Sequence, residues 1–137
     1  MKSANLILVI IIISIVVVSL TIIYLQSPKV LQKNTYVMDV KVTDDGIMGF
    51  NIDPDGLHFG SMSAGSGGAR KLTINHVEEE VIVRVIKKGK ISKWVSNTDN
   101  FIMKKGEEQT LTFSVSIPKN TPVGFYTGEV TIILQAP

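Results

Sequence analysis

The chain contains 137 residues, with 14 basic and 12 acidic side chains and a formal net charge of +2. This near balance lacks the concentrated positive charge with which nucleic-acid-binding domains neutralise phosphates, so we expect no nucleic-acid partner. No cysteine is present, which excludes disulfide bridges and any lipid anchor attached to a cysteine.

The first predicted element is a membrane-spanning helix at residues 6–25, preceded by a short tail at residues 1–5. The stretch carries no charge, and an α-helix of that length spans about 30 Å, the thickness of a hydrocarbon core. The two serines and one threonine within it cost less on insertion than its leucines, isoleucines and valines gain. We therefore expect this segment to hold the protein in a membrane bilayer.

The N-terminus has more than one expected outcome in processing. The apolar stretch is longer than the roughly 7 to 15 residues typical of a secretory signal, and no small-residue cleavage site follows it, which favours an uncleaved anchor. Lys2-Ser3-Ala4 lies directly before the stretch and resembles the leader of type IV pilin-like precursors, which are cut ahead of the apolar segment. That resemblance implies a filament subunit whose mature chain begins at Asn5.

Two opposing signals bear on the membrane orientation. Lys29, Lys33 and Lys41 follow the helix, and by the positive-inside rule this count favours an internal C-terminus. A short N-terminal tail, in contrast, usually stays inside, and the resemblance described below also implies an external domain. We expect the part of the chain after the helix to lie outside the cytoplasm.

Beyond a polar connector at residues 26–34, side chains alternate between apolar and polar, which is the pattern of half-buried strands. Strands are expected near residues 35–42, 47–52, 57–60, 72–74, 81–86, 91–96, 101–103, 110–117 and 126–134. Turn-forming Gly, Pro, Asn and Asp residues separate them, and no helical period is present. About seven to nine such strands predict an all-β fold for residues 35–137, a single Ig-like antiparallel β-sandwich domain.

Several stretches of this region carry a resemblance to a known class of domain. Residues 106–118 contain a Gly-Glu turn and an alternating strand that ends in Pro118, and a Gly-x-Tyr opening follows at Gly124–Tyr126. Together with residues 57–60 and 71–75, this segment resembles prokaryotic Ig-like surface domains. The resemblance implies an extracytoplasmic binding module without enzymatic activity. Archaellum stator subunits share the layout of one anchor and one sandwich.

The segment 81–96 is the part of the domain that indicates where a partner binds. Its first strand has apolar side chains on both faces: Val81, Val83 and Val85 on one, Ile82 and Ile86 on the other. We expect a hairpin with a turn at Gly89. A two-residue turn puts Trp94 beside the valines, whereas a three-residue turn puts it beside Ile82 and Ile86.

Either register of this hairpin leaves a second apolar face, which another part of the same domain or a partner must cover. We therefore take Ile82, Ile86 and Trp94 as the candidate partner-binding residues. The expected partners are envelope or surface-layer proteins, or a second copy of the chain.

Asp53 and Asp55 are weak candidates for a metal site. Asn51, Asp53 and Asp55 have the alternate spacing with which an EF-hand calcium loop begins. Met62 occupies the twelfth position, where that loop needs a bidentate Glu, so a looser cation site or a plain turn remains. The two histidines of the chain are too few for a three-histidine zinc site.

The sequence contains neither a nucleophile elbow nor a Gly-rich phosphate loop. We therefore expect no enzymatic activity, no cofactor and no small-molecule substrate. The expected function is protein binding in the cell envelope by a single-pass membrane protein. The alternative is a pilin-like or archaellum-associated filament or stator subunit whose apolar helix serves in assembly.

Overall fold

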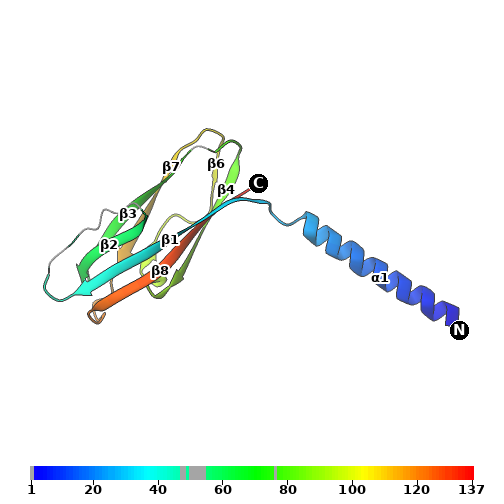
Figure 1. Ribbon diagram of the computed structural model, residues 1–137, viewed down its shortest axis with the longest axis horizontal. Helices are drawn as coiled ribbons and strands as arrows, with labels where there is room; N and C mark the ends of the chain where they lie inside the picture. Colours follow the sequence, from blue (N-terminus) through cyan, green and yellow to red (C-terminus); the bar gives the residue numbers. More distant parts are fainter. Residues whose placement is uncertain (1, 47–48, 50–54, 76) are drawn as a thin grey trace.

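The computed structural model describes residues 2–46, 49, 55–75 and 77–137, and these form one helix followed by eight strands in two sheets (Figure 1). The helix α1 covers Lys2–Leu25. The strands are β1 (Val30–Thr43), β2 (Gly56–Ser63), β3 (Gly67–Ile74), β4 (Val81–Gly89), β5 (Val95–Ser96), β6 (Phe101–Met103), β7 (Gln109–Ser116) and β8 (Gly124–Gln135). A short 3-10 helix, η1 (Lys90–Lys93), lies between β4 and β5.

The helix α1 extends away from the β-sheet head (Figure 1). Its apolar span Ser3–Leu25 has a mean hydropathy of 3.4 and is unburied along its whole length. The hydroxyls of Ser14, Ser19 and Thr21 donate to the carbonyl oxygens four residues earlier at 2.8–2.9 Å, so these polar groups need no water. By length and composition, α1 is suited to cross a membrane as an anchor or to act as a signal sequence.

The larger sheet has the strand order β2-β1-β8-β4-β6, and the smaller sheet has the order β3-β7-β5. All neighbouring strands run antiparallel except β1 and β2, which are parallel. The expected purely antiparallel, all-β sandwich is therefore wrong in this pair, and with its helix the chain is α+β. β1 and β2 can run parallel because the connection between them, residues 44–55, is about twelve residues long. A connection of this length lets the chain return toward the end of the sheet where β1 began.

The strand β1 begins at Val30 instead of near residue 35. It pairs with β8 from Val30↔Gln135 to Val42↔Gly124. The connector to α1 is thus reduced to residues 26–29. Residues 30–35 are exposed on both faces, so the alternation that signals a strand is missing although the backbone is paired.

The expected hairpin at residues 81–96 does not form, and both registers considered for it are wrong. β4 pairs with β8 and β6, whereas β5 joins β7 in the other sheet. The chain leaves the larger sheet at Gly89, which has a φ of 96° and lies so close to β8 that a Cβ would be 2.6 Å from Gly128 Cα. η1 then carries the chain across, with Ile91 fully buried.

The core lies between the inward faces of the two sheets. Alternate residues of each long strand supply it, and the alternation expected for residues 110–117 is confirmed because Leu111, Phe113, Val115 and Ile117 are all buried. Gln135, in register with Ile82 at the end of β8, is also buried. The other buried strand residues lie at inward positions and are Met38, Val40, Val42, Leu57, Phe59, Met62, Val81, Val83, Val95, Met103, Gly128, Val130, Ile132 and Leu134. Burying these inward positions leaves the opposite face of the larger sheet as an outward surface.

Candidate interaction surface

The outward face of the larger sheet carries the apolar residues that the sequence singled out on β4. Ile82 and Ile86 alternate with the buried Val81 and Val83 and are themselves half-buried. Ile102 on the edge strand β6 is directly opposite Ile82 and is 60 % exposed. Within the described part of the chain, two sheets are the only layers of the head, so nothing in it covers this face.

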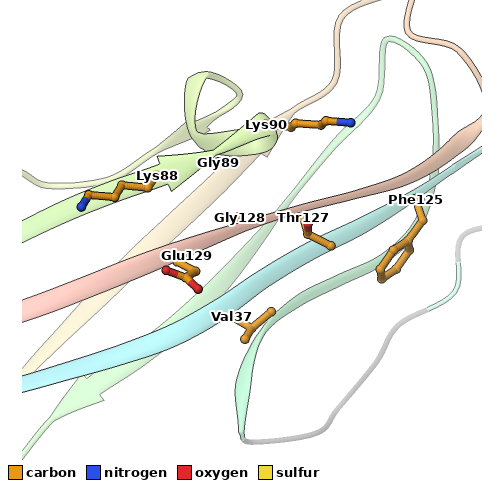
Figure 2. A pocket seen from close by; sticks show the side chains of 8 residues that line it. All are labelled: Val37, Lys88, Gly89, Lys90, Phe125, Thr127, Gly128 and Glu129. Carbon is orange, nitrogen blue, oxygen red and sulfur yellow. The ribbon is translucent and has the colours of Figure 1, made fainter.

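A hollow opens on the same face where β4 ends. The β4–β8 pairing stops at Gly89↔Gly128, so the first residues of β8 have no β4 neighbour on that side. Figure 2 shows Val37 of β1 and Phe125 of β8 at this hollow, together with Lys88 and Lys90. Its volume is about 550 Å³. Val37 is 49 % and Phe125 is 66 % exposed, so two large apolar side chains face solvent here.

The charges on this outward face are mixed, with more cations than anions. Lys33, Lys41, Arg84 and Lys88 occupy outward positions, as do Asp39 and Glu129. Glu129 lies in register between Val37 on β1 and Lys88 on β4. The outward face of the larger sheet is therefore a mixed surface of apolar and charged side chains.

Trp94 does not lie on this face. It follows η1, and its ring centroid is 4.9 Å from that of Tyr126, with the planes tilted by 57°. Trp94 also packs against the buried core, and its carbonyl accepts a hydrogen bond from the Ser116 backbone N–H at 2.8 Å. The structure therefore places Ile82 and Ile86 on the same outward face and Trp94 on the inner side of the larger sheet.

A histidine held between two carboxylates lies at the β1–β2 edge of the outward face. His58 Nδ1 is 2.5 Å from Asp39 Oδ2, and His58 Nε2 is 2.8 Å from Asp55 Oδ1. The hydrogen bond to Asp55 raises the pKa of His58 most; burial lowers this pKa, and Asp39 raises it further. Because both carboxylates are acceptors when ionised, only the protonated imidazole donates to both at once.

Sequence reasoning missed this cluster. Asp39 and His58 are register partners across the parallel β1–β2 pair, a pairing for which the sequence contains no local signal. The motif around Asp55 suggested a cation ligand, but in the structure its carboxylate binds His58. The spacing of Asp55 and His58, three residues apart at the start of β2, is the one signal available in the sequence.

The candidate metal ligands are placed only in part. Asp53 lies outside the described residues, and the side chain of Asp55 is 79 % exposed. Among the residues that the structure describes, no group of three or more His, Asp or Glu side chains is arranged to hold a metal ion. The second histidine, His76, also lies outside the described residues.

Comparison with known proteins yields no significant match to a family model, to a curated protein or to a solved structure. The function is therefore inferred from the helix, the head and the surfaces described above. These features comprise an unburied apolar helix, a head with an uncovered outward face, and a hollow lined by Val37 and Phe125.

Proposed function

We propose that the chain is a non-enzymatic single-pass membrane protein that presents an extracytoplasmic Ig-like domain for binding to other proteins of the cell envelope. The observation that carries the proposal is the unburied apolar span Ser3–Leu25, joined directly to a β-sheet head. A span of this length exceeds what a cleaved signal needs and matches what an anchor needs. The hydroxyls of Ser14, Ser19 and Thr21 within it are satisfied inside the helix, as residence in hydrocarbon requires.

The connector keeps the head close to the bilayer. Residues 26–29 reach about 14 Å when fully extended, because an extended chain spans at most about 3.6 Å per residue. Partners of the head are then confined to proteins at the membrane surface, which are envelope proteins or other copies of the chain. The uncovered face with Ile82, Ile86 and Ile102 offers them an apolar contact area.

The Ig-like assignment rests on the two packed sheets and on the resemblance of the β7–β8 region to prokaryotic Ig-like surface domains. The parallel β1–β2 pair departs from the usual antiparallel arrangement of such domains. A domain of this type works by contact surfaces, which agrees with the mixed apolar and charged outward face.

Crosslinking in native membranes tests the docking role of the outward face. Partners crosslinked to the unmodified chain should be lost from the Ile82→Thr/Ile86→Thr double variant. They should be retained by the Thr110→Ser/Thr112→Ser double variant, which changes two exposed residues of β7 in the smaller sheet. Equal recovery of the same partners with both variants removes the outward face as the docking surface.

Mass spectrometry of the mature N-terminus separates the anchor from the filament subunit. A chain that retains Met1 is expected for the anchor, whereas a chain that begins at Asn5 indicates the pilin-like alternative. Loss of the whole apolar span would show that α1 is a cleaved signal and would overturn membrane anchoring.

A further inference from the structure

The first half of β1 has a free edge. β1 pairs with β8 along its whole length, but its parallel partner β2 begins opposite Val37. Within the described residues, nothing pairs with the other edge of Val30–Tyr36. The backbone N–H and C=O groups of alternate strand residues point to opposite edges of the strand. The groups of Val30–Tyr36 that point away from β8 therefore have no strand partner.

An opening between the two sheets lies beside this edge. Its volume is about 290 Å³, and its lining residues, all uncharged, are Gln32, Asn34, Tyr36, Leu72, Thr73, Ile74, Asn75, Ile132 and Leu134. β3, which contributes Leu72 and Ile74, is itself the edge strand of the smaller sheet. In the middle of β3, Arg70 Nε donates to the His58 carbonyl at 2.7 Å and joins the sheets. The opening is thus confined to the half of the head nearest α1.

We propose that this edge accepts an extended segment of another envelope polypeptide as an added strand beside Val30–Tyr36. The backbone of the segment would form hydrogen bonds with the unpaired backbone groups of Val30–Tyr36. Its alternate side chains would enter the opening beside Gln32, Asn34 and Leu72. This interaction uses the free edge of β1 and the opening beside it, whereas docking on the outward face uses Ile82, Ile86 and Ile102, so neither depends on the other.

The charge of the free edge defines the chemistry of the segment. Val30–Tyr36 contains one charged side chain, Lys33, and no Asp or Glu. On β3, Lys71 alternates with Leu72 and so faces away from the opening, and Arg70 is bonded to the His58 carbonyl. The segment therefore has uncharged side chains toward the opening and acidic side chains on its solvent side, opposite Lys33. A second copy fits less well, because it would set its own Lys33 against this cationic edge.

Amide hydrogen exchange of the full-length chain in detergent micelles tests the proposal with a defined probe. The probe is a nine-residue peptide with glutamate at alternate positions and valine or threonine between them. Its binding should slow exchange at alternate amides within Val30–Tyr36 at least tenfold and leave the amides of the edge strand β6 unchanged. Two versions N-methylated on opposite sets of alternate residues serve as controls, because only one set faces the protein. One version should bind like the unmodified peptide, and the other should lose binding.

A charge reversal on the protein tests the chemistry of the segment. Lys33→Glu should weaken binding of the acidic peptide at least tenfold and favour a peptide with lysine in place of glutamate. Lys88→Glu, on the outward face but away from this edge, should leave both affinities within a factor of two. Trp94 fluorescence shows that each variant is folded, since this single tryptophan packs against Tyr126.

Three results would overturn the proposal. The first is the absence of protection in Val30–Tyr36 at millimolar peptide, and the second is equal binding of both N-methylated peptides. The third is a disulfide-linked dimer of an Asn34→Cys chain in micelles, which would show that a second copy occupies the edge; the chain has no other cysteine. None of these results affects crosslinking through the outward face, so the two proposals fail separately.

Discussion

Paired substitutions on the two faces of β4 distinguish a docking face from a face that the domain itself needs. Ile82→Thr/Ile86→Thr changes two half-buried outward residues, and Val81→Thr/Val83→Thr changes two buried inward residues of the same strand. Threonine keeps the β-branched shape that strands favour, so the two variants differ mainly in what surrounds the new hydroxyls.

The expected cost of each variant follows from its burial. A fully buried isoleucine contributes about 1.5–3 kcal/mol to stability. Ile82 and Ile86 are only partly buried, and the hydroxyl of a threonine in their place stays hydrated, so each outward substitution should lower the free energy of unfolding by about 0.5–1 kcal/mol. The outward pair then costs about 1–2 kcal/mol. Each inward threonine buries a hydroxyl without a partner at about 1–3 kcal/mol, or about 4 kcal/mol for the pair.

These costs convert to different melting temperatures. At about 4–8 °C per kcal/mol for a domain of this size, the outward pair should lower Tm by roughly 5–15 °C and the inward pair by more than about 15 °C. Trp94 fluorescence of the full-length chain in micelles measures both, because the single tryptophan lies in the head. Crosslinking to partners should be lost only for the outward pair.

The reasoning is refuted if the outward pair lowers Tm as much as the inward pair while crosslinking is unchanged. That result would mean that Ile82 and Ile86 serve the stability of the domain and face no partner. A small Tm change together with unchanged crosslinking would also remove the face as a docking surface, without implying that the domain needs it.

Three further predictions concern pH, topology and the backbone. The raised pKa of His58 means that its stabilising contribution is complete below about pH 6.5 and is lost as pH rises through the raised value; Tm should fall as the pH rises above about 6.5, and His58→Gln should flatten that dependence. A cysteine at the exposed Asn120 should react with a membrane-impermeant maleimide on intact cells if the head is extracytoplasmic, and labelling only after lysis would contradict that orientation. Gly89→Ala should cost about 2 kcal/mol or more, because its φ is positive and a Cβ would contact Gly128. Gly46→Ala, with positive φ but nothing within 4 Å, should cost about 1 kcal/mol, and equal losses in Tm would contradict the steric argument.

The features that the sequence predicted are those with local periodicity. Residues 110–117 alternate because one face of β7 is buried, and the apolar helix is evident because hydrocarbon requires a long uncharged stretch. The start of β1 escaped prediction because residues 30–35 are exposed on both faces although their backbone is paired. The candidate surface was anticipated at Ile82 and Ile86 because apolar residues on both faces of a strand are visible in the sequence.

The remaining features depend on contacts between distant residues. The parallel β1–β2 pair, and with it the Asp39–His58 contact, follows from a long connection whose path no local pattern specifies. The position of Trp94 depends on Gly89, where the backbones of β4 and β8 lie close together and the chain leaves the larger sheet for the smaller one. Val37 and Phe125 come together only through the β1–β8 pairing.

The route by which α1 joins the head has a mechanical consequence. α1 leads directly into β1, a strand inside the larger sheet, and the Ala136 N–H donates to the Lys29 carbonyl at 2.9 Å, which extends the β1–β8 ladder to the connector. Tension between the membrane and a bound partner would pull β1 along its own axis. The ladder would then bear the load in shear, with its hydrogen bonds strained together instead of opening one after another, so the head is built to resist pulling forces.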